Sequence, residues 1–331
     1  MKQKKNQILR GNQKTMATLN DFEIWSQYLY RFNEGVDMSD YMSDTACLSA
    51  ENINSRGADF LNDKSRLRER IPHSWLLEEY GVIEDGIVTS FTDDSNLVYK
   101  ALTSSACVVK DVAESSGDGI LFVNKISDEK YKEILDSSIG KKLLVTEWAI
   151  QHNYANNIFS AGSNSMRFLV YCPDEGDPRI AACVHKWSTR HSGITDNWNK
   201  GGLSTSVVNG ILLDTMEDFT KIEQRGGNGS TREPMYPTIP HRFSYHPESG
   251  SKIMGIKIPF WKEAVQMVVD SSNVLKRDLP YIGWDIIITK DGPRIIEGNP
   301  WPGIQLIQVH YPLFGDIHFR EFMEYYGVEG I

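Results

Sequence analysis

The spacing of hydrophobic residues changes along the chain. Between residues 20 and 80, apolar side chains recur three and four positions apart, which is the spacing of one helix face. Examples are Phe22, Trp25, Tyr28, Leu29 and Phe32, followed by Leu61, Leu67 and Ile71. From about residue 105 onward, short β-rich runs replace this pattern and predict strands at 106–110, 119–123 and 142–146, with a helix at about 127–138.

The second half of the chain continues the strand-rich pattern. Further strands are predicted at 166–171, 180–187, 204–213, 281–289 and 294–297, and one clear helix lies near 259–277. Strand-rich segments with interspersed helices predict an α+β fold. The glycine- and proline-rich stretch 222–250 is predicted to be a long loop, and such loops in compact domains are often functional.

The 331 residues are enough for about two domains at roughly 150 residues each. We expect four segments. They are a flexible basic tail at 1–19, a mainly helical region at 20–104, a small β-rich subdomain at 105–150 and a larger mixed α/β subdomain at 151–331.

Charge and cysteine content narrow the class of protein. The net charge is −9, and residues 1–14 hold five cations and no acid, so the remainder carries −14. An acidic body attracts divalent cations and repels the nucleic-acid backbone, which argues against a nucleic-acid-binding role. The four cysteines are too sparse for a disulfide framework, and no stretch approaches the roughly 18 apolar residues of a membrane span. We therefore expect a soluble, cytoplasmic protein without membrane insertion.

The segment 281–300 carries the most informative chemistry. Two β-branched runs flank Asp291-Gly292, which is a strong hairpin signal. If Thr289 pairs with Pro293, the same register places Asp285 opposite Glu297, with Asn299 on the same face.

Facing carboxylates repel each other unless a positive charge lies between them. A Mg²⁺ ion that also binds nucleotide phosphates suits this oxygen-rich set. Repulsion further predicts that neutralising Asp285 and Glu297 leaves the fold intact. Two other interpretations stay open at this point, namely solvated residues of an edge hairpin and the acid/base pair of a glycosidase.

Three further segments are candidates for nucleotide contacts. A strand ending at Lys110 leads into a small-residue loop at 115–119, whose backbone N–H groups and neighbouring lysine suit phosphates. Lys64 is a second candidate cation, and 143–150 is a candidate hinge for an adenine edge. Taken alone, each has a plain structural interpretation, respectively a simple turn, a solvated lysine and a core strand.

In order and spacing, these segments resemble the ATP-grasp superfamily, and most closely its sugar-transfer-associated family, over about residues 60–310. The motifs that carry the resemblance are Asn62-Asp63-Lys64, Val108-Val109-Lys110 with Gly117-Asp118-Gly119, Glu147 with Gln151-His152, Ser165-Met166-Arg167, Asp196-Asn197 with Gly201-Gly202, His246-Pro247 with Ile258-Pro259-Phe260-Trp261, and Gly283-Trp284-Asp285 to Glu297-Gly298-Asn299. The resemblance implies an ATP-grasp fold, in which 105–150 forms a lid and 151–331 the central catalytic subdomain, with ATP bound between them.

The resemblance also implies roles for individual residues. The residues implied to bind ATP are Lys64, Lys110, Ser115, Ser116, Gly117, Gly119, Glu147, Trp148, Ile150 and Asn197, of which Glu147, Trp148 and Ile150 line the adenine pocket. Arg167, Lys186 and Asn299 are implied to be catalytic, with Arg167 facing the transferred phosphoryl group. Asp285, Glu297 and Asn299 are implied to hold Mg²⁺.

The implied reaction activates a carboxylate as an acyl phosphate for attack by an amine or similar nucleophile. The substrates would be ATP, a small-molecule or glycan carboxylate and an amine, in surface-polysaccharide or peptide tailoring with possible glycosyltransferase-pathway partners. Two alternatives use the same site. One is an ATP-dependent phosphotransferase acting on a sugar or small acceptor. The other is a degenerate nucleotide-binding partner of a glycosyltransferase, motivated by the acidic Asp111 and Asp118 in the phosphate region.

Overall fold

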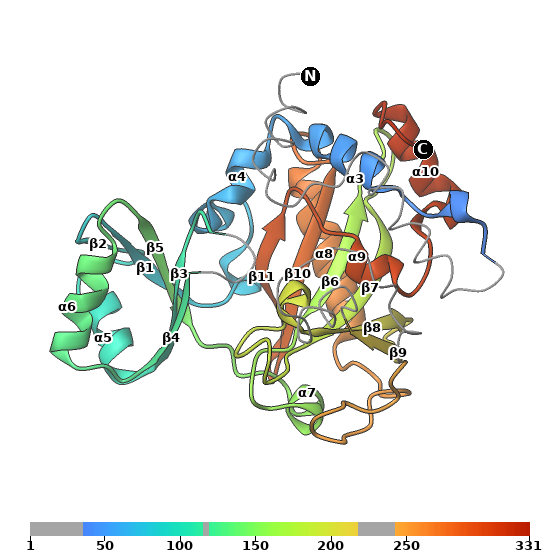
Figure 1. Ribbon diagram of the computed structural model, residues 1–331. Coiled ribbons are helices and arrows are strands. Elements are labelled where there is room, and N and C mark those ends of the chain that lie inside the picture. The colour runs from blue at the N-terminus through green and yellow to red at the C-terminus, as the bar shows by residue number, and fades with distance from the viewer. Residues whose placement is uncertain (1–35, 115–118, 218–241) are drawn as a thin grey trace, which may run out of the picture.

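The computed structural model describes residues 36–114, 119–217 and 242–331, which form two antiparallel sheets with helices packed on them (Figure 1). The smaller sheet stands to one side of the larger body, which carries both the N-terminal helices and the C-terminal helix. The expected basic tail at 1–19, the helix pattern at 20–35, the loop residues Ser115, Ser116 and Gly117, and positions 222–241 of the expected long loop lie outside the described residues.

The smaller sheet has five strands in the order β2-β1-β5-β3-β4. Their bounds are β1 (Glu79–Glu84), β2 (Ile87–Ser90), β3 (Ala106–Asp111), β4 (Ile120–Asn124) and β5 (Lys142–Glu147). Helices α5 (Leu97–Ser104) and α6 (Asp128–Ser137) share a hydrophobic core with the sheet, which includes Ile83, Leu102, Ile134 and Val145. The helix expected at about 127–138 and the three strands expected in this region are therefore confirmed.

The expected boundary at residue 105 needs correction, because β1, β2 and α5 lie within the range expected to be mainly helical. Strand β1 pairs with β5 at the centre of the small sheet. It joins β2 through Asp85 and Gly86, which both have positive φ, at 49° and 76°. Positive φ at both central residues is the geometry of a tight hairpin turn. The small sheet therefore begins at Glu79.

The larger sheet has six strands in the order β11-β10-β6-β7-β8-β9. Their bounds are β6 (Met166–Tyr171), β7 (Arg179–Trp187), β8 (Leu203–Val208), β9 (Ile211–Glu217), β10 (Tyr281–Thr289) and β11 (Gly292–Asn299). The single strand expected at 204–213 is wrong, because Asn209 and Gly210 turn the chain with φ values of 51° and 75°. Val207 and Val208 pair instead with Leu212 and Ile211 of the following strand.

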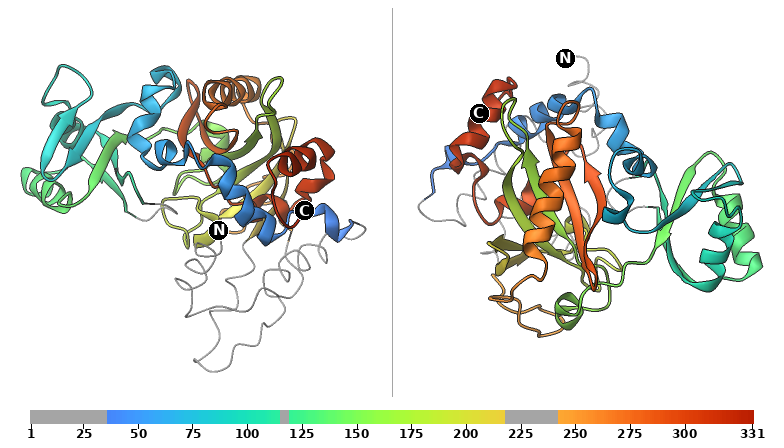
Figure 2. Two further views of the ribbon diagram at one scale, coloured as in Figure 1. Left: turned by 90° about the horizontal axis from the view of Figure 1, so that it is seen from above. Right: turned by 180° about the vertical axis from the view of Figure 1, so that it is seen from behind.

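Side-chain alternation along the strands gives this sheet two buried faces. Met166, Phe168 and Val170 point to a core that contains α8 (Trp261–Leu275), the helix seen in front of the strands in the rear view of Figure 2. Leu169 and Tyr171 point to a second core on the other face. That core is covered by α3 (Asp44–Ala50), α9 (Gln305–Gln308) and α10 (Ile317–Tyr325).

The remaining elements are short. They are the 3₁₀ helices η1 (Met38–Asp40), η2 (Glu51–Asn54), η3 (Lys64–Glu69), η4 (His73–Trp75), η5 (Trp198–Lys200) and η7 (Leu313–Gly315), and the helices α4 (Ala58–Asn62) and α7 (Asn153–Ile158). None of the helices in the described segments combines the length and the apolar character that a bilayer crossing requires.

Asp44, the first residue of α3, offers a test of the packing on this face. Its Oδ2 atom is buried and has no hydrogen-bond partner among the described residues, and burial raises the pKa of the carboxyl group from 3.8 to about 6. Because the pKa is higher in the folded state, ionisation above pH 6 disfavours folding, and this cost vanishes below pH 4. We expect Asp44→Asn to raise the free energy of unfolding by about 1–2 kcal/mol at pH 8, after the loss of a favourable helix-dipole contact.

Urea unfolding at pH 8 and pH 4 would check this expectation. The matched control is Asp128→Asn, because Asp128 is the first residue of α6 but is exposed. This control should show no gain at pH 8. Equal gains in the two variants, or a gain from Asp44→Asn that persists at pH 4, would contradict the assignment.

Candidate functional site

The carboxylate hairpin forms with the predicted register at the end that carries Asp285 and Glu297. Asp285 of β10 lies opposite Glu297 of β11, and Gly283 lies opposite Asn299. The predicted pairing of Thr289 with Pro293 is wrong, since Thr289 pairs with Gly292. A β-bulge at Ile296 absorbs this one-residue difference, because Ile286 pairs with Ile295 while Asp285 pairs with Glu297.

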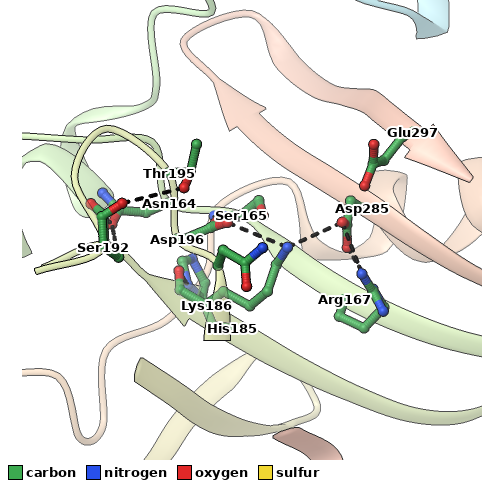
Figure 3. Close-up of polar contacts among 12 residues, drawn as sticks. Asn164, Ser165, Arg167, His185, Lys186, Ser192, Thr195, Asp196, Asp285 and Glu297 are labelled. Atoms are coloured by element: carbon green, nitrogen blue, oxygen red, sulfur yellow. Dashed lines mark hydrogen bonds and ion pairs between the residues drawn. The ribbon is translucent and has the colours of Figure 1, made fainter. Parts of the chain in front are cut away.

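Asp285 lies within a chain of four buried charges that crosses three strands and a loop (Figure 3). Arg167 of β6 donates from Nε to Oδ1 at 2.6 Å and from Nη2 to Oδ2 at 3.0 Å. Lys186 of β7 donates from Nζ to Oδ2 at 3.1 Å, and the same Nζ lies 3.3 Å from Oδ1 of Asp196. The four side chains are between 5% and 11% exposed, so water screens these interactions weakly.

Burial and charge have opposite effects on the pKa values of three of these groups, Asp285, Lys186 and Arg167. Burial alone would raise the pKa of Asp285, but Arg167 and Lys186 hold it well below its usual range. Burial alone would lower the pKa of Lys186 and of Arg167, but neighbouring carboxylates raise both. Asp196 is the larger of the carboxylate effects on Lys186, and Asp285 is the larger on Arg167. Asp285, Lys186 and Arg167 are therefore charged at neutral pH.

This arrangement changes the interpretation of Asp285. The positive charge expected beside it is supplied by Arg167 and Lys186. Asp285 is the counter-ion of two buried cations, which argues against the expectation that neutralising the carboxylate pair leaves the fold intact without a cost in stability.

Asp196 is the one of these four charged residues to which the sequence analysis assigned no role. Its Oδ2 atom accepts hydrogen bonds from the backbone N–H and the hydroxyl group of Ser165, both at 2.6 Å. Ser165 immediately precedes β6, so these bonds fasten the 188–202 loop beside Lys186. The Asp196-Asn197 dipeptide was the available signal, although no spacing rule linked it to Lys186.

Glu297 and Asn299 lie on the same edge strand, next to Asp285. Asn299 donates from Nδ2 to the carbonyl oxygen of Gly283 at 3.2 Å and lies 3.5 Å from Oε1 of Glu297. In residues 36–114, 119–217 and 242–331, no three His, Cys, Asp or Glu side chains form a metal-binding group. The predicted set contains two carboxylates and an amide, and such oxygens fit Mg²⁺. Glu297 and Asn299 fit directly, whereas both oxygens of Asp285 face cations.

Lys110 of the small sheet reaches this hairpin, and Lys64 of η3 contacts the loop that follows β3. Lys110 of β3 is 8% exposed and places its Nζ 3.5 Å from the carbonyl oxygen of Ile296, the bulge residue. Burial lowers the pKa of Lys110, while Glu297 and Glu79 act in the opposite direction. Lys64 donates to the carbonyl oxygens of Val112 and Glu114, at 3.4 and 2.5 Å, and so contacts the arm of the loop that follows β3.

The three residues predicted to line the adenine pocket lie at the end of β5 and just after it. The backbone N–H of Glu147 donates to the carbonyl oxygen of Glu78. In return, the backbone N–H of Glu78 donates to Oε1 of the Glu147 side chain at 3.0 Å. The ring of Trp148 packs edge-on against Phe122 with centroids 4.6 Å apart. Ile150 is 65% exposed. Phe122 was missed because its strand position gives no sign of what it faces, and it adds an aromatic surface beside Trp148.

Two other predicted residues show a local structural role. Asn197 caps η5 by accepting a hydrogen bond from the N–H of Asn199. Gly119 has φ of +69°, and its carbonyl oxygen accepts from the N–H of Asp111 at 3.2 Å, which closes the described end of the loop.

Two antiparallel sheets whose lysines and arginine meet at a carboxylate hairpin form the arrangement expected of an ATP-grasp protein. The chain belongs to the sugar-transfer-associated ATP-grasp family, because the family model described as "Sugar-transfer associated ATP-grasp" matches residues 50–314. This match confirms the family resemblance and the α+β ATP-grasp fold that the sequence predicts.

Similar solved structures include a crystal structure of N5-carboxyaminoimidazole ribonucleotide synthetase in complex with ADP, with 13% identity and a TM-score of 0.42. That match covers 82% of this chain and 53% of the synthetase, so this chain spans about half the synthetase's length. A second is D-alanine–D-alanine ligase from Bacillus anthracis, with 12% identity, a TM-score of 0.43, and coverage of 82% of this chain and 70% of the ligase. No curated protein matches the sequence significantly. Likenesses this distant say nothing about substrate.

Proposed function

We propose that the protein is an ATP- and Mg²⁺-dependent ligase that activates a carboxylate as an acyl phosphate, which an amine or similar nucleophile then attacks. The observation that carries this proposal is the meeting of cations from both sheets at one hairpin. Lys110 of the small sheet and Arg167 and Lys186 of the large sheet gather around Asp285 and Glu297. Cations with carboxylates beside them suit a triphosphate with its metal ion.

The geometry of each cationic side chain suits a different set of phosphate oxygens. The planar fork of Arg167 suits two phosphoryl oxygens at once, and Lys186 adds a point charge beside it. Lys110 and Lys64 suit the remaining phosphate oxygens from the side of the small sheet. The carboxylate oxygen of the acid attacks the terminal phosphorus and ADP leaves. The nucleophile then attacks the acyl carbon and phosphate leaves.

Glu297 and Asn299 are the proposed first metal ligands, with Asp285 as the third member of the set. When bound, Mg²⁺ neutralises phosphate charge and fixes the oxygens for in-line transfer. The adenine base is proposed to lie against Glu147, Trp148 and Ile150, with Phe122 beside them. Ser115, Ser116, Gly117 and Gly119 remain proposed phosphate contacts, and Asn197 a proposed supporting residue.

Only the chemical class of the carboxylate and amine substrates is proposed. A small-molecule or glycan carboxylate and an amine are the proposed substrates, in surface-polysaccharide or peptide tailoring. A cytoplasmic location and a glycosyltransferase-pathway partner remain part of the same proposal.

Nucleotide binding is the first expected result. Calorimetric titration of ATP should show binding with Mg²⁺ present and markedly weaker binding in EDTA, because the cations around the hairpin are already offset by carboxylates. Lys110→Met should weaken Mg-ATP binding, while Lys290→Met, an exposed lysine in the turn of the same hairpin, should not. No ATP binding under either condition would contradict the proposal and favour a degenerate nucleotide-binding module.

The chemistry is tested by substrate dependence. A panel of acids and amines should reveal phosphate release that requires both an acid and an amine, since the acyl phosphate forms only with the acid and turns over only with the nucleophile. ADP formation with a sugar or hydroxyl acceptor alone, yielding a stable phosphorylated product, would indicate a phosphotransferase instead.

A further inference from the structure

Two kinds of partner compete for the carboxylate oxygens of Asp285, namely the neighbouring cations and the proposed metal ion. In the structure both oxygens bind Arg167 and Lys186, whereas the proposed function asks the same carboxylate to face a metal ion together with Glu297 and Asn299. A carboxylate that neutralises two buried cations is a poor metal ligand until one of them finds another anion.

Lys186 has such an anion next to it. Its Nζ lies 3.1 Å from Oδ2 of Asp285 and 3.3 Å from Oδ1 of Asp196, so the two carboxylates share one ammonium group almost equally. Figure 3 shows Lys186 between them, with Asp196 on the side of the 188–202 loop and Asp285 on the side of Glu297. Asp196 cannot leave easily, because Ser165 binds its other oxygen with two bonds of 2.6 Å.

We propose that Asp196 is a positioning residue that retains Lys186 when Asp285 turns from Lys186 to the metal ion. This inference rests on the proposed function. Before nucleotide binds, Arg167 and Lys186 together occupy the oxygens of Asp285. When the phosphates of ATP arrive, Lys186 and Arg167 gain phosphate oxygens as partners, Asp196 keeps Lys186 in place, and Asp285 becomes available to the metal. Metal and nucleotide therefore bind with positive coupling.

The first test uses Mn²⁺ as a paramagnetic substitute for Mg²⁺, since carboxylate and amide oxygens suit both ions. Free Mn²⁺ is measured by electron paramagnetic resonance without nucleotide. Lys186→Met should leave Arg167 as the one cation that binds Asp285 among the described residues, and should therefore tighten Mn²⁺ binding on the order of tenfold relative to the unmodified protein. Adding Asp285→Asn to Lys186→Met should abolish this gain.

The matched control is Lys110→Met, which removes a positive charge beside Glu297 without touching the shared ammonium. It reports how much a changed charge alone alters Mn²⁺ affinity. The inference is overturned if Lys186→Met gains no more than Lys110→Met, or if the gain survives Asp285→Asn. Circular dichroism and melting curves verify that each variant is folded. If Lys186→Met unfolds, Lys186→Gln keeps a polar group between the carboxylates and takes its place.

The second test concerns Asp196 itself and uses an ATP analogue with an imido group between the β- and γ-phosphates. With this analogue bound, Asp196→Asn should weaken Mn²⁺ binding on the order of tenfold, because Lys186 then holds Asp285 more firmly. In the Lys186→Met background the same substitution should have little effect. Equal losses in both backgrounds would mean that Asp196 acts as a distant charge and not through Lys186, which overturns its positioning role.

The two proposals fail differently. If the unmodified protein binds neither the analogue nor Mn²⁺ when both are present, the proposed function is wrong. If it binds both, but Mn²⁺ binds equally tightly with and without the analogue, the function stands and the exchange of Asp285 is wrong.

Discussion

Replacing Asp285 by asparagine is expected to lower the free energy of unfolding by about 3–5 kcal/mol, which is the usual cost of removing one partner of a buried ion pair. Arg167 and Lys186 both lie within 3.1 Å of this carboxylate and are at most 11% exposed. An asparagine keeps one acceptor but no charge, so Lys186 would keep its ion pair with Asp196 while Arg167 would lose its ion pair with Asp285. Urea unfolding followed by tryptophan fluorescence at pH 7 would measure the loss.

Glu297→Gln is the matched control for this substitution. Glu297 lies directly opposite Asp285 and is also a proposed metal ligand, but its side chain is only partly buried. It should cost less than about 1 kcal/mol, because Glu297 is partly exposed and forms no ion pair within 4 Å among the described residues. Equal losses from the two variants would show that Asp285 has no special role as a counter-ion.

The pH dependence gives an independent check on the same pair. The pKa of Asp285 is lower in the folded protein than its ordinary value of 3.8. Its contribution to stability is therefore fully present above pH 4 and is lost as the pH falls further, through the folded-state pKa. The difference in stability between the unmodified protein and Asp285→Asn should be constant from pH 5 to pH 7 and should shrink at lower pH. A difference that grows on acidification would contradict the ion-pair explanation.

The hairpin shows how far a sequence pattern can predict a site. The Asp-Gly signal and the period of two correctly placed Asp285 opposite Glu297, although the assumed turn was one residue too long. The bulge at Ile296 restored the register. A bulge has no reliable sequence signature, because any residue can occupy the extra position. Here it also turns the Ile296 carbonyl oxygen toward Lys110, so the irregular residue links the two sheets.

The start of the small sheet could have been predicted but was not. Asp85-Gly86 lies between two apolar runs, which is the same signal that identified the hairpin at 281–300. The helix-like spacing of Leu61, Leu67 and Ile71 led to a predicted helical region that continues to residue 104, whereas the first strand begins at Glu79. The pairing of β1 with β5, however, joins residues about 60 positions apart, and no local pattern gives such a long-range contact.

The four-charge chain lies beyond sequence analysis for a similar reason. Arg167, Lys186, Asp196 and Asp285 come from three strands and a loop, and their distances depend on the strand order β10-β6-β7. The residue types suggested catalytic cations and metal ligands separately. Only the fold shows that Asp285 forms ion pairs with both cations and that Asp196 shares one of them.

Arg167→Lys is expected to slow turnover by about 10²–10³-fold, the usual loss when a donor to the transition state is removed. Arg167 binds both oxygens of Asp285 through Nε and Nη2, which fixes the plane of its guanidinium group. Lysine keeps the charge but offers no planar fork, so it cannot hold two phosphoryl oxygens in one geometry. Because the charge remains, the Kd for Mg-ATP should change far less than the rate. Measuring phosphate release with a responsive acid and amine pair, together with calorimetric titration of Mg-ATP, separates the effect on turnover from the effect on binding.

Arg70→Lys is the matched control, because it alters an arginine paired with Asp278 at the surface. It should leave both turnover and Mg-ATP binding unchanged. An equal loss of binding and turnover in Arg167→Lys would assign Arg167 to nucleotide binding instead of phosphoryl transfer.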